Sequence, residues 1–248
     1  MEYFERFCIK GPEKLKCPIH SNPELEVVYV KEGEMEINYG KDSVVVKKGQ
    51  AALIFPYWLH KFDQTGDTEA YVLMFPSYVY EGLFLQYKNK LPSAYKFNFT
   101  PEAIVYVESL IRKRNELSEY EIKSLYYTCI SSFFKQNTFQ GETNNTLLQK
   151  MMEVIYDNVL ENITIKSVSA QCGVSEAFLI SYLKNQVRMK FKDCVNGLLV
   201  NKAVELLRRT TLSITQVAIQ SGFGSLRSFN RIFAETMGCT PTQYRKKL

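Results

Sequence analysis

The stretch LSITQVAIQSGFGSLRSFNRIFAETMGCTPTQYR, residues 212–245, decides the fold of the C-terminal part of the chain. Apolar residues recur at helical spacing on both sides of a break at residues 221–223: Ile214, Val217 and Ala218 precede it, and Phe229, Ile232 and Phe233 follow it. Gly222 suits the end of the first helix because glycine adopts a left-handed conformation without steric cost. Ser225 is a candidate N-cap of the second helix, and Thr240-Pro241 predicts a third. The pattern is that of a helix-turn-helix.

The second helix of this unit has an outward face that carries basic residues. At about 100° per residue, burying Phe229, Ile232 and Phe233 points Arg227 and Arg231 the other way. In a helix-turn-helix this face of the second helix meets the bases of DNA. We therefore expect Ser225, Arg227, Asn230 and Arg231 to contact DNA.

The same pattern occurs once earlier in the chain. Residues Ile165, Val168, Ser169, Gly173 and Val174 match the second unit at an offset of 49, and Leu179, Tyr182 and Leu183 match it at an offset of 50. Two such units predict tandem helix-turn-helix modules. Residues 191–210 carry apolar residues on one side and predict a connecting helix, which at roughly 1.5 Å per residue spans about 30 Å. One turn of DNA is about 34 Å long, so both second helices can enter successive major grooves.

Residues 147–248 resemble the DNA-binding domain of the AraC/XylS family of bacterial transcription regulators. The matching residues are Ser175, Leu179, Lys184, Lys202, Ala203, Leu206, Leu207, Gly222, Phe223, Phe229, Arg231, Phe233, Gly238, Thr240, Pro241, Tyr244 and Arg245. Rotating the second helix of the first unit in the same way points Ala177, Ser181 and Lys184 outward, and we expect these residues and Ser175 to contact DNA. The family often has arginine where Ser181 and Leu199 stand. Ala177 and Ser181 offer far less hydrogen bonding to base edges than Arg227 and Arg231. We therefore expect the two recognition helices to contribute unequally to the recognition of DNA sequence.

Charge is distributed unevenly along the 248 residues. Residues 162–248 hold 13 Lys and Arg against 4 Asp and Glu, whereas residues 1–140 hold 17 against 18. An excess of positive charge in the tandem domain is expected of a surface that meets phosphates. The six cysteines lack the paired spacing of a zinc or redox site and are expected to be reduced. We find no signal peptide or membrane-length apolar run, and we expect a cytoplasmic protein without membrane association.

The N-terminal part reads as strands. Residues 34–38 alternate polar and apolar side chains, Gly40-Lys41-Asp42 predicts a turn, and residues 44–46, 51–55 and 71–75 are further β-rich runs. Short antiparallel strands at this spacing favour a small barrel or sandwich. The predicted fold class is therefore α+β: an N-terminal domain over residues 1–136, with the barrel reaching to about 80, then a linker over 137–146 and an all-α domain over 147–248. The resemblance to the regulator family implies that the N-terminal domain senses an effector and dimerises.

The barrel segment resembles the cupin-like sensor domain of the same regulators. The resemblance rests on His20, Glu26, Gly33, Gly49, Pro56 and His60 in this order. We expect a pocket for a small-molecule effector in which His20, Glu26 and His60 offer polar contacts and Tyr57, Trp58 and Phe62 form apolar walls. One alternative is that His20 and His60 are structural residues at strand ends, with their hydrogen bonds made within the protein. Another is a metal site. Metal cupins place a His-x-His pair where this chain has His20-Ser21-Asn22, so we predict no metal and no cofactor.

Residues 100–137 predict two helices that follow the barrel. Thr100-Pro101-Glu102 is a start signal, and Ser118 to Glu121 form a capping box. The apolar band of the second helix is wider than one neighbour requires. The resemblance implies that this helical pair packs on the barrel and forms a homodimer, although packing within one chain would explain the band as well.

These observations predict a sequence-specific DNA-binding transcription regulator that responds to an effector and has no catalytic residues. Its expected partners are double-stranded DNA and a second copy of the chain, with RNA polymerase as a further candidate. One alternative is a metal-dependent cupin enzyme fused to a DNA-binding domain. Another is a regulator whose front domain only dimerises or binds a protein.

Overall fold

The computed structural model describes residues 7–12, 17–39, 42–64, 66–80, 90–142, 146–158, 163–187 and 189–246. The chain forms two compact units. Residues 1–16 and 22–147 make up the first unit, and residues 148–248 with the short segment 17–21 make up the second. In the described ranges every helix falls short of the length and hydropathy needed to cross a membrane. The five cysteines whose side chains are described are free thiols, as the sequence predicted.

A five-stranded antiparallel sheet forms one layer of the first unit. Its strands follow the order β1 (Cys8–Lys10), β8 (Glu69–Phe75), β3 (Leu25–Glu32), β6 (Gln50–Ile54) and β10 (Lys96–Asn98). Residues 25–30 of the central strand β3 are all buried, which explains the unbroken apolar run around the single charge of Glu26. The predicted runs at 51–55 and 71–75 are strands β6 and β8.

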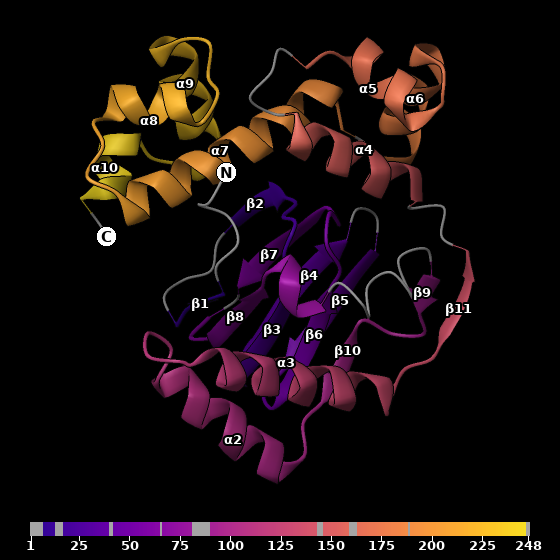
Figure 1. Ribbon diagram of the computed structural model, residues 1–248, viewed down its shortest axis with the longest axis vertical. Coiled ribbons are helices and arrows are strands. Elements are labelled where there is room, and N and C mark those ends of the chain that lie inside the picture. Colours follow the sequence, from indigo (N-terminus) through magenta and orange to yellow (C-terminus); the bar gives the residue numbers. More distant parts are fainter. Residues whose placement is uncertain are drawn as a thin grey trace. The chain divides into compact units, whose positions relative to one another are not determined.

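A second sheet has four strands, in the order β2 (Cys17–His20), β7 (His60–Gln64), β4 (Glu34–Tyr39) and β5 (Asp42–Lys47), of which β7, β4 and β5 belong to the first unit. Strand β4 buries Met35, Ile37 and Tyr39, which is the alternation that the sequence predicted for a strand with one covered face. The predicted turn falls on Gly40 and Lys41, which lie outside the described residues. Figure 1 shows these strands, from indigo to purple, beside the helices that follow them.

Helices α2 (Pro101–Arg112) and α3 (Glu119–Phe134) confirm the predicted helical pair, and they lie together along one side of the strands in Figure 1. Thr100 caps α2, and Ser118 with Glu121 forms a capping box on α3. Helix α3 packs on the five-stranded sheet through aromatic rings. Tyr126 meets Phe75 with ring centroids 5.5 Å apart, and Phe133 meets Phe97 at 5.7 Å.

The polar composition of residues 137–146 predicted a linker, without predicting any strand in it. This stretch contains strand β11 (Phe139–Glu142), which pairs with β9 (Lys90–Pro92). The reason is Phe139, whose ring lies 5.4 Å from that of Phe134 and 5.9 Å from that of Phe55. One aromatic anchor is enough to hold a polar segment against the first unit.

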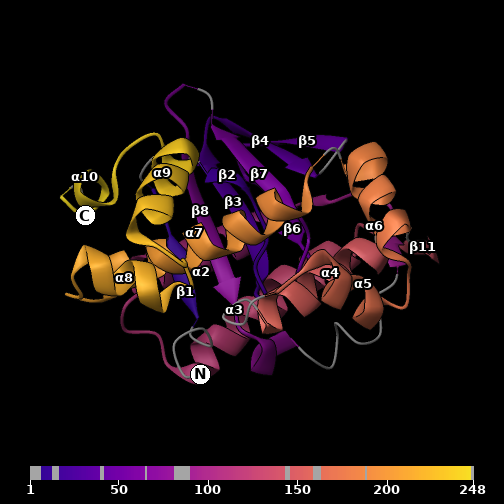
Figure 2. The same ribbon diagram turned by 90° about the horizontal axis from the view of Figure 1, so that it is seen from above.

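The second unit is helical, apart from the short segment 17–21. Its helices are α4 (Thr146–Asp157), α5 (Ile165–Cys172), α6 (Glu176–Tyr182), the π-helical turn η1 (Leu183–Val187), α7 (Phe191–Arg209), α8 (Ile214–Gln220), α9 (Leu226–Met237) and α10 (Pro241–Arg245). Figures 1 and 2 agree that α8, α9 and α10 gather at the C-terminal end of α7, and that α5 and α6 lie toward its other end. The long helix α7 is the connecting helix predicted for residues 191–210.

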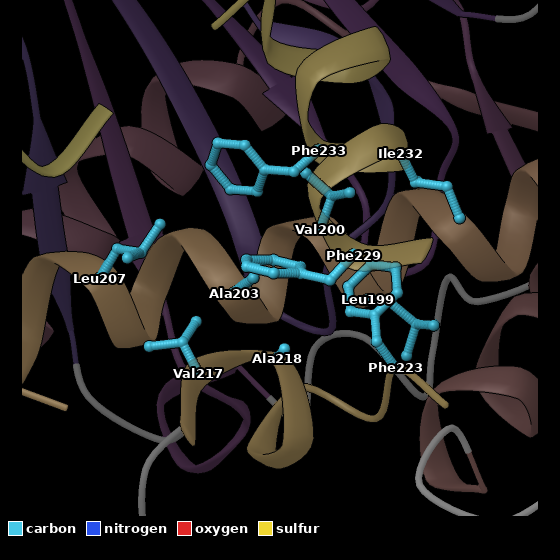
Figure 3. Packing of buried hydrophobic residues seen from close by; sticks show 10 residues of the cluster. All are labelled: Leu199, Val200, Ala203, Leu207, Val217, Ala218, Phe223, Phe229, Ile232 and Phe233. Carbon is cyan, nitrogen blue, oxygen red and sulfur yellow. The ribbon is translucent and has the colours of Figure 1, made fainter. Parts of the chain in front are cut away.

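Helix α7 and the last helices share one apolar core. It consists of Leu199, Val200, Ala203 and Leu207 of α7, Val217 and Ala218 of α8, Phe223 of the turn, and Phe229, Ile232 and Phe233 of α9. Figure 3 shows the ring of Phe229 lying between the side chains from α7 and those from α8. The helical periodicity predicted most of these residues but missed Val200, which is completely buried, and it placed Leu206 inside, where the side chain is only partly buried. The α+β fold class is confirmed.

Candidate nucleic-acid interface and barrel site

The second helix-turn-helix is built by α8, a short turn and α9. The Ser221 hydroxyl is buried and donates to the carbonyl of Val217 at 2.6 Å, which closes the end of α8. Gly222 follows with φ 93°, a conformation that favours glycine. The Ser225 hydroxyl then accepts a hydrogen bond from the amide of Ser228 at 3.1 Å and starts α9. These local bonds fix the angle at which α9 leaves the turn.

Helix α9 separates its apolar and polar residues as predicted. Phe229, Ile232 and Phe233 are buried, whereas Arg227, Asn230 and Arg231 are exposed. The arginines are one turn apart, so two guanidinium groups stand on the same outward face. Each can donate two hydrogen bonds to a guanine or clamp a phosphate.

The two arginines differ in their surroundings. Nη1 of Arg231 lies 2.9 Å from both carboxylate oxygens of Glu235, one turn further along α9. Arg227 forms no ion pair with any residue that the structure describes. The guanidinium of Arg227 is therefore unengaged among the described residues, whereas Arg231 has Nη1 occupied by a carboxylate and keeps the donors of Nη2 and Nε.

The first helix-turn-helix has the same local construction. Thr164 caps α5 in a capping box with Ser167, and Gly173 ends it with φ 75°. The Ser175 hydroxyl accepts from the amide of Phe178 at 3.2 Å and starts α6. Ser175 and Ser225 are thus N-caps at equivalent positions, which confirms the repeat that the sequence predicted.

Helix α6 exposes Ala177 and Ser181 and buries Leu179. The Ser181 hydroxyl accepts a hydrogen bond from Nδ2 of Asn185 at 3.1 Å, so part of its small capacity is already used. Lys184 is exposed. The predicted rotation assumed that it belongs to the α-helix, but the structure places it outside α6. It lies in the π-helical turn η1, whose wider winding changes the direction of its side chain.

Two exposed apolar residues of α6 were not singled out from the sequence. Phe178 and Ile180 are 53% and 49% exposed, although both are large and apolar. They flank Leu179, and a helical wheel places each about 100° from that buried residue. The exposure could have been anticipated from this rotation.

A buried polar pair joins the two sheets of the first unit. Nε2 of His60 on β7 lies 3.4 Å from Oε2 of Glu26 on β3, and both side chains are 1% exposed. The other ring nitrogen of His60 lies 2.9 Å from the carbonyl oxygen of Trp58. The Asn22 side-chain amide donates to the second oxygen of Glu26. The carboxylate and imidazole predicted to share a site are therefore in contact.

His20, at the end of β2, completes the predicted polar group. One ligand atom from each of His20, Glu26 and His60 lies within 4.8 Å of the other two, and all three side chains are buried. Two imidazoles and a carboxylate form a donor set that suits a divalent transition metal. Asn22 stands where a metal cupin would have a further histidine, and its amide is already bonded to Glu26.

Aromatic rings surround this polar group, and only some of them were predicted. Trp58 and Phe62 are buried, with the Phe62 ring 5.0 Å from His60, whereas Tyr57 is half-buried with φ 62°. The sequence analysis missed Tyr39 and Tyr95, whose rings stack 4.4 Å apart beside Trp58. The alternation of polar and apolar residues in β4 places Tyr39 on the covered face, so it could have indicated from the sequence that Tyr39 lies inside the barrel.

The hydroxyl of Tyr39 is buried and finds no hydrogen-bond partner among the described residues. Burial raises the pKa of this phenol well above its usual value, and the charges of Tyr95 and Glu26 raise it further. Tyr39 is therefore a neutral donor inside the first unit. A donor of this kind beside a carboxylate and an imidazole can orient a polar group of a small molecule.

Comparisons with known proteins match both units. A family model described as a cupin domain matches residues 8–76, and one described as a helix-turn-helix domain matches residues 168–247. The HTH-type transcriptional activator RhaR of Mannheimia succiniciproducens is 21% identical over 155 residues, which cover 59% of this chain and 56% of RhaR. An HTH-type transcriptional regulator of Bacillus subtilis, YfiF, is 29% identical over 103 residues, which cover 42% of this chain and 32% of the relative. The chain thus spans less than two thirds of either relative.

Among solved structures, ToxT from Vibrio cholerae has a TM-score of 0.67 at 15% identity, covering 98% of both chains. This likeness shows a shared fold over the whole chain. A cupin domain followed by an AraC-type helix-turn-helix domain defines the class of protein. The relatives that match include HTH-type transcriptional regulators, among them the activators RhaR and RhaS.

The Arg231–Glu235 pair leads to a prediction. Replacing Glu235 with Gln should strengthen binding to a DNA fragment selected by the parent protein by roughly twofold, because an exposed helical ion pair holds Arg231 by only about 0.3–0.5 kcal/mol. Glu119→Gln is the matched control, since it removes an exposed pair of the same spacing with Lys123 in α3. Titration by fluorescence anisotropy measures both. Weaker binding by Glu235→Gln would mean that the carboxylate positions Arg231 for DNA.

Proposed function

We propose that this protein is a sequence-specific DNA-binding transcription regulator that inserts α6 and α9 into successive major grooves. The observation that carries the proposal is the pair of helix-turn-helix modules, each with a serine-capped second helix, joined by α7. Helix α7 has 19 residues and spans about 28 Å at roughly 1.5 Å per residue. This length is close to one turn of DNA, which is about 34 Å.

Charge and relatives support the same function. The excess of 13 basic over 4 acidic residues lies in residues 162–248, which contain both modules. The relatives RhaR and YfiF are HTH-type transcriptional regulators. A positive domain of this kind releases counterions when it binds DNA. DNA is therefore the partner that we propose for the second unit, in a cytoplasmic protein.

For the first unit we propose a sensor of a small molecule rather than an enzyme. Glu26 and His60 offer a carboxylate and an imidazole between two sheets, the Tyr39 phenol adds a donor, and Trp58 and Phe62 add apolar surface. A ligand that replaces the contact between Glu26 and His60 would change the packing between the sheets. One solved structure of ToxT holds an unsaturated fatty acid, which is a precedent in a protein of the same fold.

A second candidate function is favoured by one observation. The donor atoms of His20, Glu26 and His60 lie within 4.8 Å of one another, so these residues would hold a divalent metal of an enzyme joined to a DNA-binding domain. The missing His-x-His pair argues against it, because Asn22 stands where the second histidine would be and its side-chain amide donates to Oε1 of Glu26.

We also propose that the protein forms a homodimer through α2 and α3. Val105 and Tyr106 on α2 and Tyr120 and Tyr127 on α3 are large apolar side chains with exposed surface, and exposed apolar residues that gather on adjacent helices mark interaction sites. The alternative, a front unit that binds another protein, would use the same residues. RNA polymerase remains a candidate partner of the DNA-bound protein.

The DNA proposal is tested by two variants measured against a randomised operator library. Arg227→Ala should cost about 1–3 kcal/mol and relax base preference in one half-site, which is the scale of a good bidentate contact to a base. Ser181→Ala should cost less and leave the preference largely intact, since its hydroxyl is short and already accepts from Asn185. A greater loss of specificity for Ser181→Ala would reverse the assignment of the two readers.

The effector proposal is tested by thermal shift with a panel of metabolites, followed by DNA binding with each compound that stabilises the parent. His60→Gln and Trp58→Phe should reduce the response of DNA binding to such a compound, while affinity without the compound stays the same. If both variants respond as the parent does, the effector site lies elsewhere. Stoichiometric metal that copurifies with the parent and is lost in His60→Gln would favour the enzyme.

A further inference from the structure

We propose that the two recognition helices read different chemistry: α6 recognises the C5 methyl groups of thymines, whereas α9 recognises hydrogen-bonding edges. This inference rests on the proposed DNA-binding function and deepens it by naming the half-site that the first module takes. It starts from equivalent positions in the two modules. On α9 the four residues around the outward face are Arg227, Ser228, Asn230 and Arg231, and on α6 they are Ala177, Phe178, Ile180 and Ser181.

Helix α6 occupies the position of a recognition helix, but its outward face carries fewer polar groups than that of α9. Leu179 is fully buried and anchors the helix as Phe229 anchors α9. The side chains at the centre of the outward face, Ala177 and Ser181, are short, so the backbone of α6 can lie deep in a groove. Phe178 and Ile180 stand on either side of them and are about half exposed. The outward surface of α6 is therefore mostly apolar, and its polar groups are the Ser181 hydroxyl and the Asn185 amide that is bonded to it.

The aromatic residue of this surface is held in place. The rings of Phe178 and Tyr182 lie nearly parallel, with centroids 6.5 Å apart and an interplanar angle of 19°. Tyr182 is half-buried, so Phe178 rests on a supported ring rather than sampling many rotamers. A pre-positioned apolar side chain loses little conformational entropy when it contacts a base.

The charges around α6 identify DNA as the occupant of this surface. In the described part of the first module, Lys166, Lys184, Lys190 and Lys192 are exposed, and the exposed acidic residues are Glu176 and Asp193. Asp193 also accepts the amide of Lys190 at the start of α7. Apolar side chains framed by lysines match a major groove, where thymine methyl groups lie between two rows of phosphates. A purely apolar protein surface would leave the lysines without partners.

The test removes the methyl groups alone. The parent protein first selects an operator from a randomised library, and the half-site whose preference Arg227→Ala relaxes is assigned to α9. Deoxyuridine then replaces each thymidine in the other half-site, which deletes the C5 methyl and leaves base pairing intact. We expect binding to weaken about fourfold for each methyl group that α6 buries. The same replacement in the α9 half-site should have a smaller effect.

Protein variants complete the cycle. Phe178→Ala and Ile180→Ala should weaken binding to the thymidine operator and lose most of the sensitivity to deoxyuridine, because the partner of the methyl group is gone. Ile219→Ala is the matched control: it removes an exposed aliphatic side chain of α8, in the same unit but outside both recognition helices. Both variant residues are half exposed, and melting curves verify that the variants fold.

The outcomes separate this inference from the proposed function. If the parent shows no sequence preference on any DNA, the proposed function fails and the inference falls with it. If the preference is intact but deoxyuridine in the α6 half-site changes nothing, the inference alone is overturned. It is also overturned if Phe178→Ala and Ile180→Ala bind both operators as the parent does and lose only transcriptional output, since their surface would then bind a protein.

Discussion

The second unit depends on the burial of Phe229 and Phe233 of α9 against Val200 and Ala203 of α7. All four side chains are completely buried, in a core that α8 closes through Val217. Truncating a phenylalanine at such a site costs roughly 3–5 kcal/mol, a large part of the stability of a typical domain. Because this face of α9 is fixed inside, the opposite face is fixed outside. The exposure of Arg227 and Arg231 is therefore a consequence of packing.

The two modules pack their second helices in the same way but carry chemically different side chains on the outward faces. Each recognition helix begins at a serine cap and turns around one buried residue, Leu179 in α6 and Phe229 in α9. The core does not constrain the outward positions, so their side chains can differ between the two modules. In α9 they carry guanidinium groups, and in α6 they carry apolar side chains. A repeated fold can thus hold two unequal readers.

How much the sequence predicts depends on the range of the interaction. Helix ends and caps depend on neighbouring residues in the chain. Gly173, Ser225 and Thr240 therefore predicted the ends of their helices correctly. The contact between Glu26 and His60 joins two sheets, and only the resemblance placed these residues together. Strand β11 was missed because one ring, Phe139, outweighs a polar stretch. The periodicity of the apolar residues did not predict the π-helical turn that contains Lys184. The residues that contact DNA or an effector remain predictions.

The central claim is that one chain presents two dissimilar readers one turn of DNA apart. Selection of binding sites for the full-length protein from a long randomised library tests it most directly. The account predicts a bipartite site whose two halves differ in sequence and whose centres are separated by about 10–10.5 base pairs, the length of one helical turn. A single short element, or two identical halves at any spacing, would contradict it.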